Sequence, residues 1–409
     1  MGDAVGSGCS RNKKTDFDSP RPVCIFLAMV PSSKIAIVHD WLTGMRGGEK
    51  VLEILCELYP EATLFTLVHK KGSCSPAIER MKIRTSYLQS LPGGLSHYRH
   101  YLPLYPAAAK SLNLAGFDLV ISSSHAAAKA VTIPPGVPHI CYCYTPMRYI
   151  WDQYDQYFGA GRASLPIRLA MRGIRGYLRE WDVRTAKRVD HFVAISHCIE
   201  ERIQRIYGRS STVIYPPVET ARFKASEHDE GYYLVFSALV PYKRVDLAVE
   251  AFNRLGKKLI VAGTGAELEK LRAMAGPTIA FKGWVEDADL PNLYAGCKAL
   301  IFPGVEDFGI VPVEAMASGK PVIAFGEGGA LETVSEGVTG TFFSEQSAQS
   351  LADAVLRLET MHFDPDVIRK HTLSFDREIF RDSIRRFIEE HSIRESRISN
   401  LRSVMGKFG

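Results

Sequence analysis

Short, continuous runs of apolar residues recur along the chain, and they are rich in Val, Ile and Phe. Runs of this kind, without apolar–polar alternation, are typical of strands buried on both faces of a parallel sheet. They cover residues 34–38, 119–122, 139–143, 191–195, 232–236, 259–262, 299–302 and 322–325. Segments with helical periodicity lie between them, at residues 49–58, 246–255, 267–274 and 313–318. Strands that alternate with helices predict βαβ units, so the expected fold class is α/β.

Two adjacent prolines mark the strongest interruption of this pattern. Pro216 and Pro217 break any regular periodicity, and the polar residues 224–231 follow before the next apolar run begins. A chain of 409 residues is long enough for two domains with ordinary cores. We therefore predict an N-terminal domain at residues 29–215 and a C-terminal domain at residues 216–375.

The two ends of the chain differ in pattern from the domains. Residues 1–28 are rich in Gly, Ser, Lys and Asp without periodicity, which predicts a disordered extension or a translation start at Met29. Residues 376–392 predict an amphipathic helix that crosses back onto the N-terminal domain. The apolar face of this helix carries Ile379, Phe380, Ile384, Phe387 and Ile388. The polar residues 393–409 predict a mobile tail.

Composition narrows the functional classes. The net charge of +5 is too small to indicate nucleic-acid binding by itself. The eight cysteines show neither CxxC pairs nor zinc-like spacing with histidine, so we expect reduced thiols and no structural metal. The apolar run at residues 23–30 is far shorter than the roughly 20 residues of a membrane-spanning helix, and no convincing cleavage site follows it. We expect a cytoplasmic protein.

The densest group of chemical markers lies between residues 299 and 322, which read as strand, loop, short helix, turn and strand. Pro312 suits the first helical position, where a missing N–H costs nothing, and Gly319 suits a left-handed cap at the end of the helix. The N-terminus of such a helix, at the carboxyl end of a parallel strand, is where α/β sheets bind anions. We expect a diphosphate to bind there.

Two carboxylates flank the start of this helix. Glu306 lies in the preceding loop and Glu314 is expected in the first helical turn, so one could contact the sugar of a nucleotide sugar and the other its ribose. Asp307, Phe308 and Gly309 complete the loop and are expected to bind the same nucleotide sugar. The alternative is that Glu314 complements the helix dipole and that Glu306 is a solvated loop residue.

These motifs resemble a known enzyme family. Glu306 and Glu314, with seven residues between them, are similar to the E-x7-E motif of glycosyltransferase family 4. Further segments resemble the donor-domain motifs of that family, in order, at residues 236–248, 261–267, 283–285 and 328–332. The resemblance covers about residues 34–390 and implies the GT-B fold, in which two Rossmann-like domains face a cleft. It also implies a retaining transfer reaction without metal or other cofactor.

Within the family, the chain most resembles lipopolysaccharide and exopolysaccharide mannosyltransferases, above all at residues 239–244 and 306–314. This implies that a hexose, mannose from GDP-mannose, is transferred to a glycan or a lipid-linked acceptor of a cell-surface polysaccharide. The residues themselves do not separate a GDP-sugar from a UDP-sugar. A noncatalytic nucleotide-sugar-binding subunit of a polysaccharide assembly complex is the alternative from another functional class.

By family analogy, Lys243 neutralises the leaving diphosphate. A flexible ammonium beside a phosphate stabilises the charge that grows as the glycosidic bond breaks. Arg244 is a second candidate cation. The chain departs from the commoner family pattern at Ala238, where that pattern has an arginine. A second phosphate-binding cation is therefore missing from its usual position unless Arg244 replaces it.

Two glycine pairs are further donor-binding candidates. Gly47 and Gly48 follow the first strand and resemble the N-terminal Gly-Gly loop of the family, where backbone N–H groups can approach a phosphate or a sugar. Gly263 and Gly265 form a short motif after a later strand. The N-terminal pair does not make the G-x-G-x-x-G fingerprint, which disfavours a Rossmann oxidoreductase.

Histidines at strand ends are candidates for contact with the reacting sugar. The family often has a functional histidine in the region of His125, where a neutral imidazole can bind a donor hydroxyl or orient the acceptor. The alternative is that His125 lies in the first turn of a helix capped by Ser123 or Ser124. His39 competes for the same role, and residues 144–148 are candidates for the acceptor side.

Asp287 and Asp289 spell the Asp-x-Asp motif by which many other glycosyltransferases hold a metal ion. They precede a helix-like segment with Pro291 in its first turn, so helix capping explains them and we expect no metal.

A basic stretch runs through residues 162–188. Its cations are Arg162, Arg168, Arg172, Arg175, Arg179, Arg184, Lys187 and Arg188, interleaved with apolar and aromatic residues. Such a mixture favours attraction to an anionic membrane surface, which would bring the enzyme to a lipid-linked acceptor at the inner face of the membrane. The alternative is a long helix whose apolar residues lie in the core and whose arginines lie in water.

Overall fold

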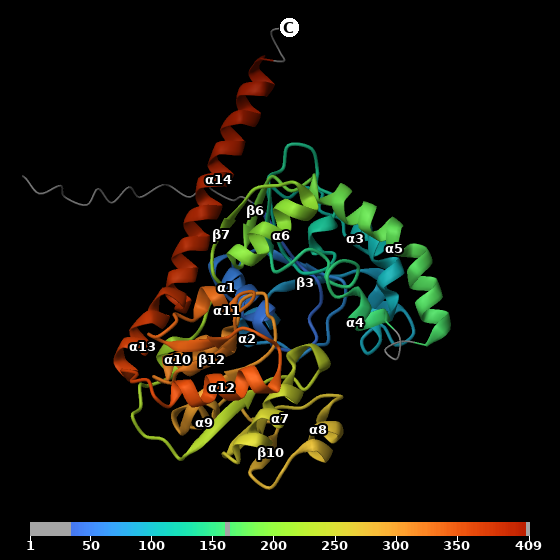
Figure 1. The fold of residues 1–409 in the computed structure, drawn as a ribbon. Coiled ribbons are helices and arrows are strands. Elements are labelled where there is room, and N and C mark those ends of the chain that lie inside the picture. Colours follow the sequence, from blue (N-terminus) through green and yellow to red (C-terminus); the bar gives the residue numbers. More distant parts are fainter. Residues whose placement is uncertain (1–33, 160–163, 406–409) are drawn as a thin grey trace, which may run out of the picture. The chain divides into compact units, whose positions relative to one another are not determined.

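The computed structural model describes residues 34–159 and 164–405, with side chains up to residue 392. It contains two parallel sheets, each covered by helices (Figure 1). The predicted extension at residues 1–28, and Arg162, lie outside the described residues. No helix in the described part of the chain is long and apolar enough to cross a bilayer.

The N-terminal sheet has seven strands in the order β3-β2-β1-β4-β5-β6-β7. The strands are β1 Ile35–His39, β2 Thr63–Thr66, β3 Lys82–Thr85, β4 Leu119–Ser124, β5 His139–Cys143, β6 His191–Ala194 and β7 Ser211–Val213. The helices of this half are α1 Gly47–Leu58, α2 Pro76–Glu79, α3 Tyr105–Ser111, α4 Tyr154–Phe158, α5 Leu165–Ala186 and α6 His197–Tyr207. Short 3-10 turns are η1 Tyr87–Ser90, η2 Tyr98–Leu104 and η3 Ala128–Ala130.

The C-terminal sheet has six strands in the order β10-β9-β8-β11-β12-β13. The strands are β8 Tyr232–Phe236, β9 Leu259–Ala262, β10 Ile279–Gly283, β11 Cys297–Phe302, β12 Val322–Phe325 and β13 Gly340–Phe343. The helices are α7 Val245–Leu255, α8 Leu268–Met274, α9 Leu290–Ala295, α10 Ile310–Ala317, α11 Ala330–Thr333, α12 Ala348–Leu358, α13 Pro365–Thr372 and α14 Arg377–Met405. Short 3-10 turns are η4 Thr220–Arg222, η5 Pro241–Lys243 and η6 Leu373–Phe375.

Both sheets reverse their strand order at one place, between β1 and β4 and between β8 and β11. Connections run to opposite faces on the two sides of such a switch point, which leaves a crevice at the carboxyl ends of the strands. The predicted boundary at residue 215 falls between β7 and β8, the last and first strands of the two sheets.

The predicted apolar runs form strands whose residues are buried on both faces of the sheets. Every residue of β4 and β5 is buried, and β1 is buried from Ala36 onward. The apolar pattern missed β2, β3, β7, β10 and β13, of which β2 is buried at all of its four residues. In β3 and β7, at the two edges of the N-terminal sheet, most residues are at least partly exposed, so they carry no continuous apolar run.

The last helix, α14, crosses back onto the N-terminal domain as predicted and lies beside α1 in Figure 1. Phe380 is 2% exposed and packs edge-on against Tyr142 of β5, with ring centroids 5.6 Å apart. Arg377 and Arg381 both form ion pairs with Glu57 of α1. These contacts tie the end of the C-terminal domain to the first helix of the chain.

Two details of α14 differ from the sequence prediction. Ile379, assigned to its apolar face, is 53% exposed, because it projects away from the seam that buries Phe380 and Ile384. The helical backbone also continues to Met405, through most of the segment predicted to be a tail.

We predict that Phe380→Ala lowers the free energy of unfolding by about 3 to 5 kcal/mol, because it removes a buried ring that joins the two domains. Ile379→Ala, one position away and exposed, should change it by less than about 1 kcal/mol. Urea denaturation followed by tryptophan fluorescence measures both. Equal losses in the two variants would contradict the placement of this seam.

Candidate active site

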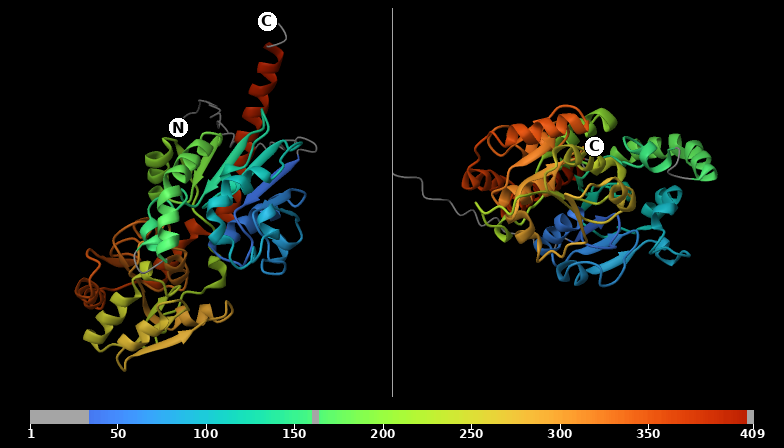
Figure 2. Two further views of the ribbon diagram at one scale, coloured as in Figure 1. Left: turned by 90° about the vertical axis from the view of Figure 1, so that its right-hand side faces the viewer. Right: turned by 60° about the horizontal axis from the view of Figure 1, so that its bottom comes forward.

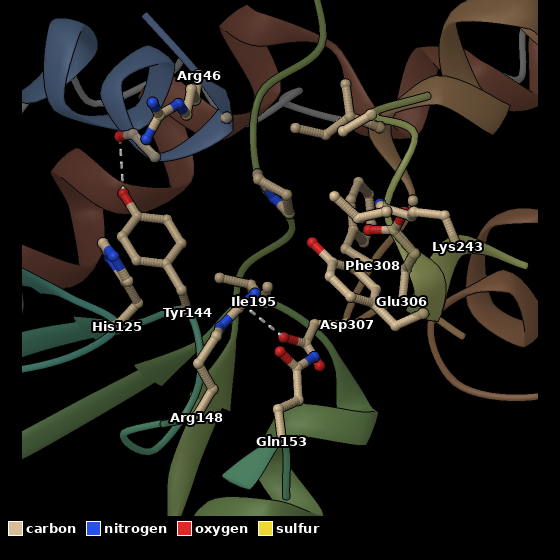
Figure 3. A pocket seen from close by; sticks show the side chains of 18 of the residues that line it. Arg46, His125, Tyr144, Arg148, Gln153, Ile195, Lys243, Glu306, Asp307 and Phe308 are labelled. Atoms are coloured by element: carbon tan, nitrogen blue, oxygen red, sulfur yellow. Dashed lines mark hydrogen bonds and ion pairs between the residues drawn. The ribbon is translucent and has the colours of Figure 1, made fainter. Parts of the chain in front are cut away.

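A cavity of about 660 Å³ opens where the switch points of the two sheets face each other. The N-terminal side is lined by His39 at the end of β1 and by His125, just after β4. The C-terminal side is lined by Lys243 from the loop after β8, and by Glu306, which follows β11. Figure 3 shows Lys243 and Glu306 on one side of the pocket and His125 on the other.

Lys243 and Glu306 form an ion pair at the C-terminal switch point. The loop of Lys243 lies against Gly304, where a Cβ would come within 2.9 Å of the Lys243 Cα, so only glycine permits this approach. Burial, and next the charge of Arg148, lower the pKa of Lys243, while Asp307 raises it. A diphosphate bound beside Lys243 would stabilise its charged form.

Asp307 bridges the two domains. Its carboxylate accepts from Arg148 Nη2 at 3.1 Å and from Arg202 Nη1 at 2.7 Å. Its backbone oxygen accepts from Ser196 Oγ at 2.6 Å, at the start of α6. On the same helix end, Glu332 of the C-terminal domain accepts from the backbone N–H of His197 and of Cys198. Carboxylates of one domain therefore satisfy donors of the other.

Asp40 holds the His125 loop in place. The buried carboxylate accepts from four consecutive backbone N–H groups, those of residues 125–128, at 2.6 to 3.0 Å. It also lies 3.0 Å from His125 Nδ1, and the imidazole packs edge-on against Trp41. Because Nδ1 is engaged, Nε2 is the ring atom left for a ligand in the pocket.

The sequence reasoning missed Asp40, although it directly follows His39 at the end of the first strand. The signal available was its position at a switch point, opposite a small-residue loop 85 positions later in the chain. The alternative for His125, a place in a helix capped by Ser123 or Ser124, is only partly met. Ser124 Oγ accepts from the N–H of Lys129 at 3.3 Å, but His125 precedes only the short turn η3, and Asp40 accepts from the N–H groups of residues 125–128.

A second buried network lies behind the Gly-Gly loop. His39 Nδ1 is 3.0 Å from Ser123 Oγ, which is 2.7 Å from the hydroxyl of Tyr144. Tyr144 donates to the backbone oxygen of Gly48 at 2.8 Å. At Gly47, a Cβ would lie 2.8 Å from the side chain of Ile310 in the other domain, so α1 and α10 begin against each other. Both glycines line the pocket, as do residues 307–309.

Two family models match adjacent parts of the chain. The model described as Glycosyltransferase Family 4 matches residues 47–222, and the model described as Glycosyl transferases group 1 matches residues 218–371. The chain belongs to glycosyltransferase family 4. The predicted family is thereby confirmed.

Similar curated members are matched over part of their length. A GDP-mannose-dependent alpha-(1-6)-phosphatidylinositol monomannoside mannosyltransferase of Mycobacterium tuberculosis is 32% identical over 196 residues, 40% of this chain and 51% of that protein. The O-antigen chain mannosyltransferase RfbU of Salmonella typhimurium is 28% identical over 151 residues, 34% of this chain and 43% of that protein. The chain spans about half the length of the curated relatives it matches.

Solved structures share the fold. Anabaena HepE in complex with UDP and glucose aligns over 88% of this chain and 100% of its own, with a TM-score of 0.63 at 19% identity. Sucrose-phosphate synthase from Thermosynechococcus elongatus aligns over 88% of this chain and 99% of its own, with a TM-score of 0.66 at 16% identity. The predicted GT-B fold is confirmed.

The helix of the E-x7-E segment in this family 4 chain begins earlier than predicted. The helix α10 begins at Ile310, two residues before Pro312, because Gly309 at φ 106° already turns the backbone into it. Glu314 therefore lies beyond the first turn. It is 5% exposed, accepts from Tyr294 at 3.0 Å and pairs with Lys50 at 3.8 Å. Burial raises its pKa, and it is not among the residues that line the pocket.

Other donor-binding candidates also lie outside the pocket lining. Arg244, with a left-handed φ of 52°, donates to Asp246 and Gln346. Gly263 and Gly265 bring their loop against the backbone that precedes Lys243: a Cβ on either would come within 2.2 Å of a carbonyl oxygen of that segment. Their donor-binding roles stay predictions.

The two aspartates of the Asp-x-Asp motif lie at the start of α9. The Asp287 side chain is 76% exposed and lies 3.9 Å from Arg222, and Asp289 occupies the N-cap position of α9. Among the described residues, no group of three or more His, Cys, Asp and Glu is arranged to hold a metal ion.

We predict that Asp40→Asn destabilises the fold by about 3 to 5 kcal/mol at pH 7, because an amide cannot accept all the hydrogen bonds of a buried carboxylate. Burial alone would raise the pKa of Asp40, but the charge and hydrogen bond of His125 dominate and lower it below 3.8. A lowered folded-state pKa means that this contribution is present above the unfolded-state pKa and is lost as pH falls below it.

Urea denaturation from pH 7 to pH 3.5 checks this prediction. The stability gap between wild type and Asp40→Asn should be constant near neutrality and shrink toward pH 3.5, whereas exposed Asp289→Asn should show almost no gap. A gap that grows on acidification would contradict the role of Asp40.

Proposed function

We propose that the protein transfers a hexose with retention, mannose from GDP-mannose, to a glycan or lipid-linked acceptor in cell-surface polysaccharide synthesis. The observation that carries the proposal is the placement of Lys243 and Glu306 opposite the Asp40-fixed His125 in one pocket. A cation, a carboxylate and an oriented imidazole at facing switch points suit a substrate with a diphosphate at one end and hydroxyls at the other.

The donor diphosphate binds between Lys243 and the start of α10 in this proposal. The eight-residue helix has no side-chain cap, and its first residues Gly309, Ile310 and Val311 line the pocket, so backbone N–H groups can receive an anion. Charge that develops on the leaving phosphate is stabilised by these donors and by Lys243. The phosphate attracts Lys243 away from Glu306, whose carboxylate is then available to the sugar hydroxyls.

The acceptor hydroxyl attacks the anomeric carbon from the face that the diphosphate leaves, which retains the configuration, and the leaving phosphate takes the proton. His125 Nε2 accepts from a donor hydroxyl or orients the acceptor. No metal or other cofactor takes part in this scheme. A covalent route through a carboxylate is the alternative for retention.

Relatives favour mannose as the sugar, because both curated proteins described above are named mannosyltransferases. A UDP-sugar is the alternative donor, since Anabaena HepE is solved with UDP and glucose. The noncatalytic binding subunit remains the alternative from another class and predicts donor binding without any turnover.

A panel of nucleotide sugars, incubated with the purified protein with and without EDTA, tests the proposal by thermal shift and by nucleotide release. We expect a selective shift with GDP-mannose and EDTA-resistant release of GDP. Glu306→Gln and Lys243→Met should each lower that release by about 100- to 1,000-fold. Asp287→Asn, on the unused Asp-x-Asp motif, serves as the matched control and should keep wild-type release.

The outcomes separate the candidates. A selective shift with a UDP-sugar replaces GDP-mannose as donor. Donor binding without release, even with added lipid-linked acceptors, contradicts the enzyme and favours the binding subunit. The absence of any shift contradicts both proposals.

We further propose that α5 brings the enzyme to an anionic membrane surface. Its first turns expose Leu165, Ile167 and Leu169, at 63%, 47% and 60%. In the right-hand view of Figure 2 the green helix α5 lies at the margin of the N-terminal domain. Exposed Arg172 lies next to them along the helix. An exposed apolar group beside cations suits the interface of an anionic bilayer.

The rest of α5 is an ordinary structural helix, as the alternative interpretation expected. Leu178 and Trp181 are buried. Arg175 lies 3.8 Å from the ring centroid of Tyr154, and both Arg175 and Arg179 donate to the backbone oxygen of Ile150. The proposed membrane contact is therefore limited to the first turns.

Sedimentation with vesicles of phosphatidylglycerol and phosphatidylcholine tests this proposal. The double variant Leu165→Ser, Leu169→Ser should bind at least about 10-fold more weakly, since two leucines lose their place in the apolar interface. Leu356→Ser, an exposed leucine of α12, should bind like wild type. Absence of salt-sensitive binding by wild-type protein would contradict the membrane proposal.

A further inference from the structure

The pocket has an alanine, Ala238, at a position where a cation could help to neutralise a diphosphate. Ala238 lies in the loop between β8 and Lys243 and lines the pocket, where the commoner family pattern has an arginine. A diphosphate carries more negative charge than Lys243 alone can balance. If the proposed function holds, another cation must reach the same end of the pocket.

Arg244 does not supply this cation. Its left-handed backbone directs the guanidinium toward Asp246, where Nε lies 3.1 Å from Oδ1 and Nη2 lies 3.1 Å from Oδ2. A further contact runs from Nη1 to Gln346 at 3.4 Å, and the residue is not part of the pocket lining. The neighbour of Lys243 in sequence is therefore committed elsewhere.

Arg148 meets the requirement from the opposite domain. It follows β5, lines the same pocket as Lys243 and Ala238, and is 25% exposed (Figure 3). Its Nε is buried without a hydrogen-bond partner among the described residues. The positive charge of Arg148 already reaches Lys243, whose pKa it lowers. A pocket lined by two cations, one of them with an unused donor, suits an anion.

The carboxylate that holds Arg148 can release it at low cost. Asp307 pairs with Arg148 at 3.1 Å and with Arg202 at 2.7 Å. Arg202 is fixed independently by Asp152 at 2.8 Å and by Thr145 at 2.8 Å. When Arg148 turns toward a ligand, Asp307 keeps its shorter ion pair and is not left as an unpaired charge.

We propose that Arg148 is the second cation of the diphosphate site and replaces, from the N-terminal domain, the arginine that is missing at Ala238. Because Arg148 and Lys243 come from different domains, the bound diphosphate joins the two halves of the cleft. The bound donor then adds a contact between the two domains. This inference rests on the proposed function and assigns a residue to its donor site.

Calorimetric titration with GDP and GMP tests it on the full chain. Arg148→Gln should weaken GDP binding by about 10- to 100-fold, the range of one lost charged hydrogen bond, and leave GMP binding within about 2-fold. Adding Ala238→Arg to Arg148→Gln should restore most of the GDP preference. Arg148→Lys should keep part of it, because a charge remains within reach.

Two control variants separate binding from structure. Arg202→Gln breaks the same bridge at Asp307 without removing the pocket cation, so it should keep the wild-type ratio of GDP to GMP affinity. Arg244→Gln should keep that ratio as well. If Arg202→Gln and Arg148→Gln lose the ratio equally, Arg148 acts only through the bridge and the inference is wrong.

Two further outcomes distinguish a failure of this inference from a failure of the proposed function. If wild type prefers GDP to GMP and Arg148→Gln keeps that preference, while only transfer to the acceptor falls, Arg148 belongs to the acceptor side and the inference fails although the proposed function stands. If wild type binds no nucleoside diphosphate, GDP or UDP, the proposed function fails, and this inference with it.

Discussion

The carboxylate of Asp307 is the contact on which the arrangement of this site depends. It extends from the loop after β11 and accepts from two arginines of the N-terminal domain, while its backbone oxygen accepts from Ser196. At the same helix end, Glu332 accepts from the first two N–H groups of α6, and Ser196 Oγ accepts from the third. These contacts hold the two switch points face to face across the pocket.

Because Asp307 holds the two domains together, their charged and polar side chains face each other across the pocket. One wall carries Lys243 with Glu306, and the other carries His125, whose ring is fixed by Asp40. Cations and uncapped backbone N–H groups gather at one end, and hydrogen-bonding side chains at the other. An anionic leaving group and a hydroxyl-bearing sugar match this polarity, which is why glycosyl transfer fits both the family and the geometry.

The sequence was most informative where chemistry and local backbone coincide. Most buried strands and the loop from Glu306 to Gly309 could be predicted, because continuous apolar runs and glycines at strand ends are local signals. The buried strand β2 was missed, since it has only four residues and a threonine at each end. Edge strands such as β3 escaped, since their exposed residues carry no apolar run. The contact of Asp40 with the His125 loop and that of Arg148 with Asp307 join positions 85 and 159 apart, which periodicity cannot show.

Glu314 shows the limit of motif reasoning. Its spacing from Glu306 is that of the family, yet its depth depends on where α10 starts. Gly309 begins the helix earlier than Pro312 suggested, so Glu314 lies in the interior against Tyr294 and Lys50. Residue spacing located the helix, and the positive φ of one glycine decided which way its carboxylate points.

A crystal structure of the protein with an intact nucleotide sugar tests the central claim most directly. We predict that the diphosphate lies between Lys243 and the first N–H groups of α10, with the hexose against Glu306 and His125. A donor bound outside this pocket, or with its diphosphate remote from Lys243, would contradict the account.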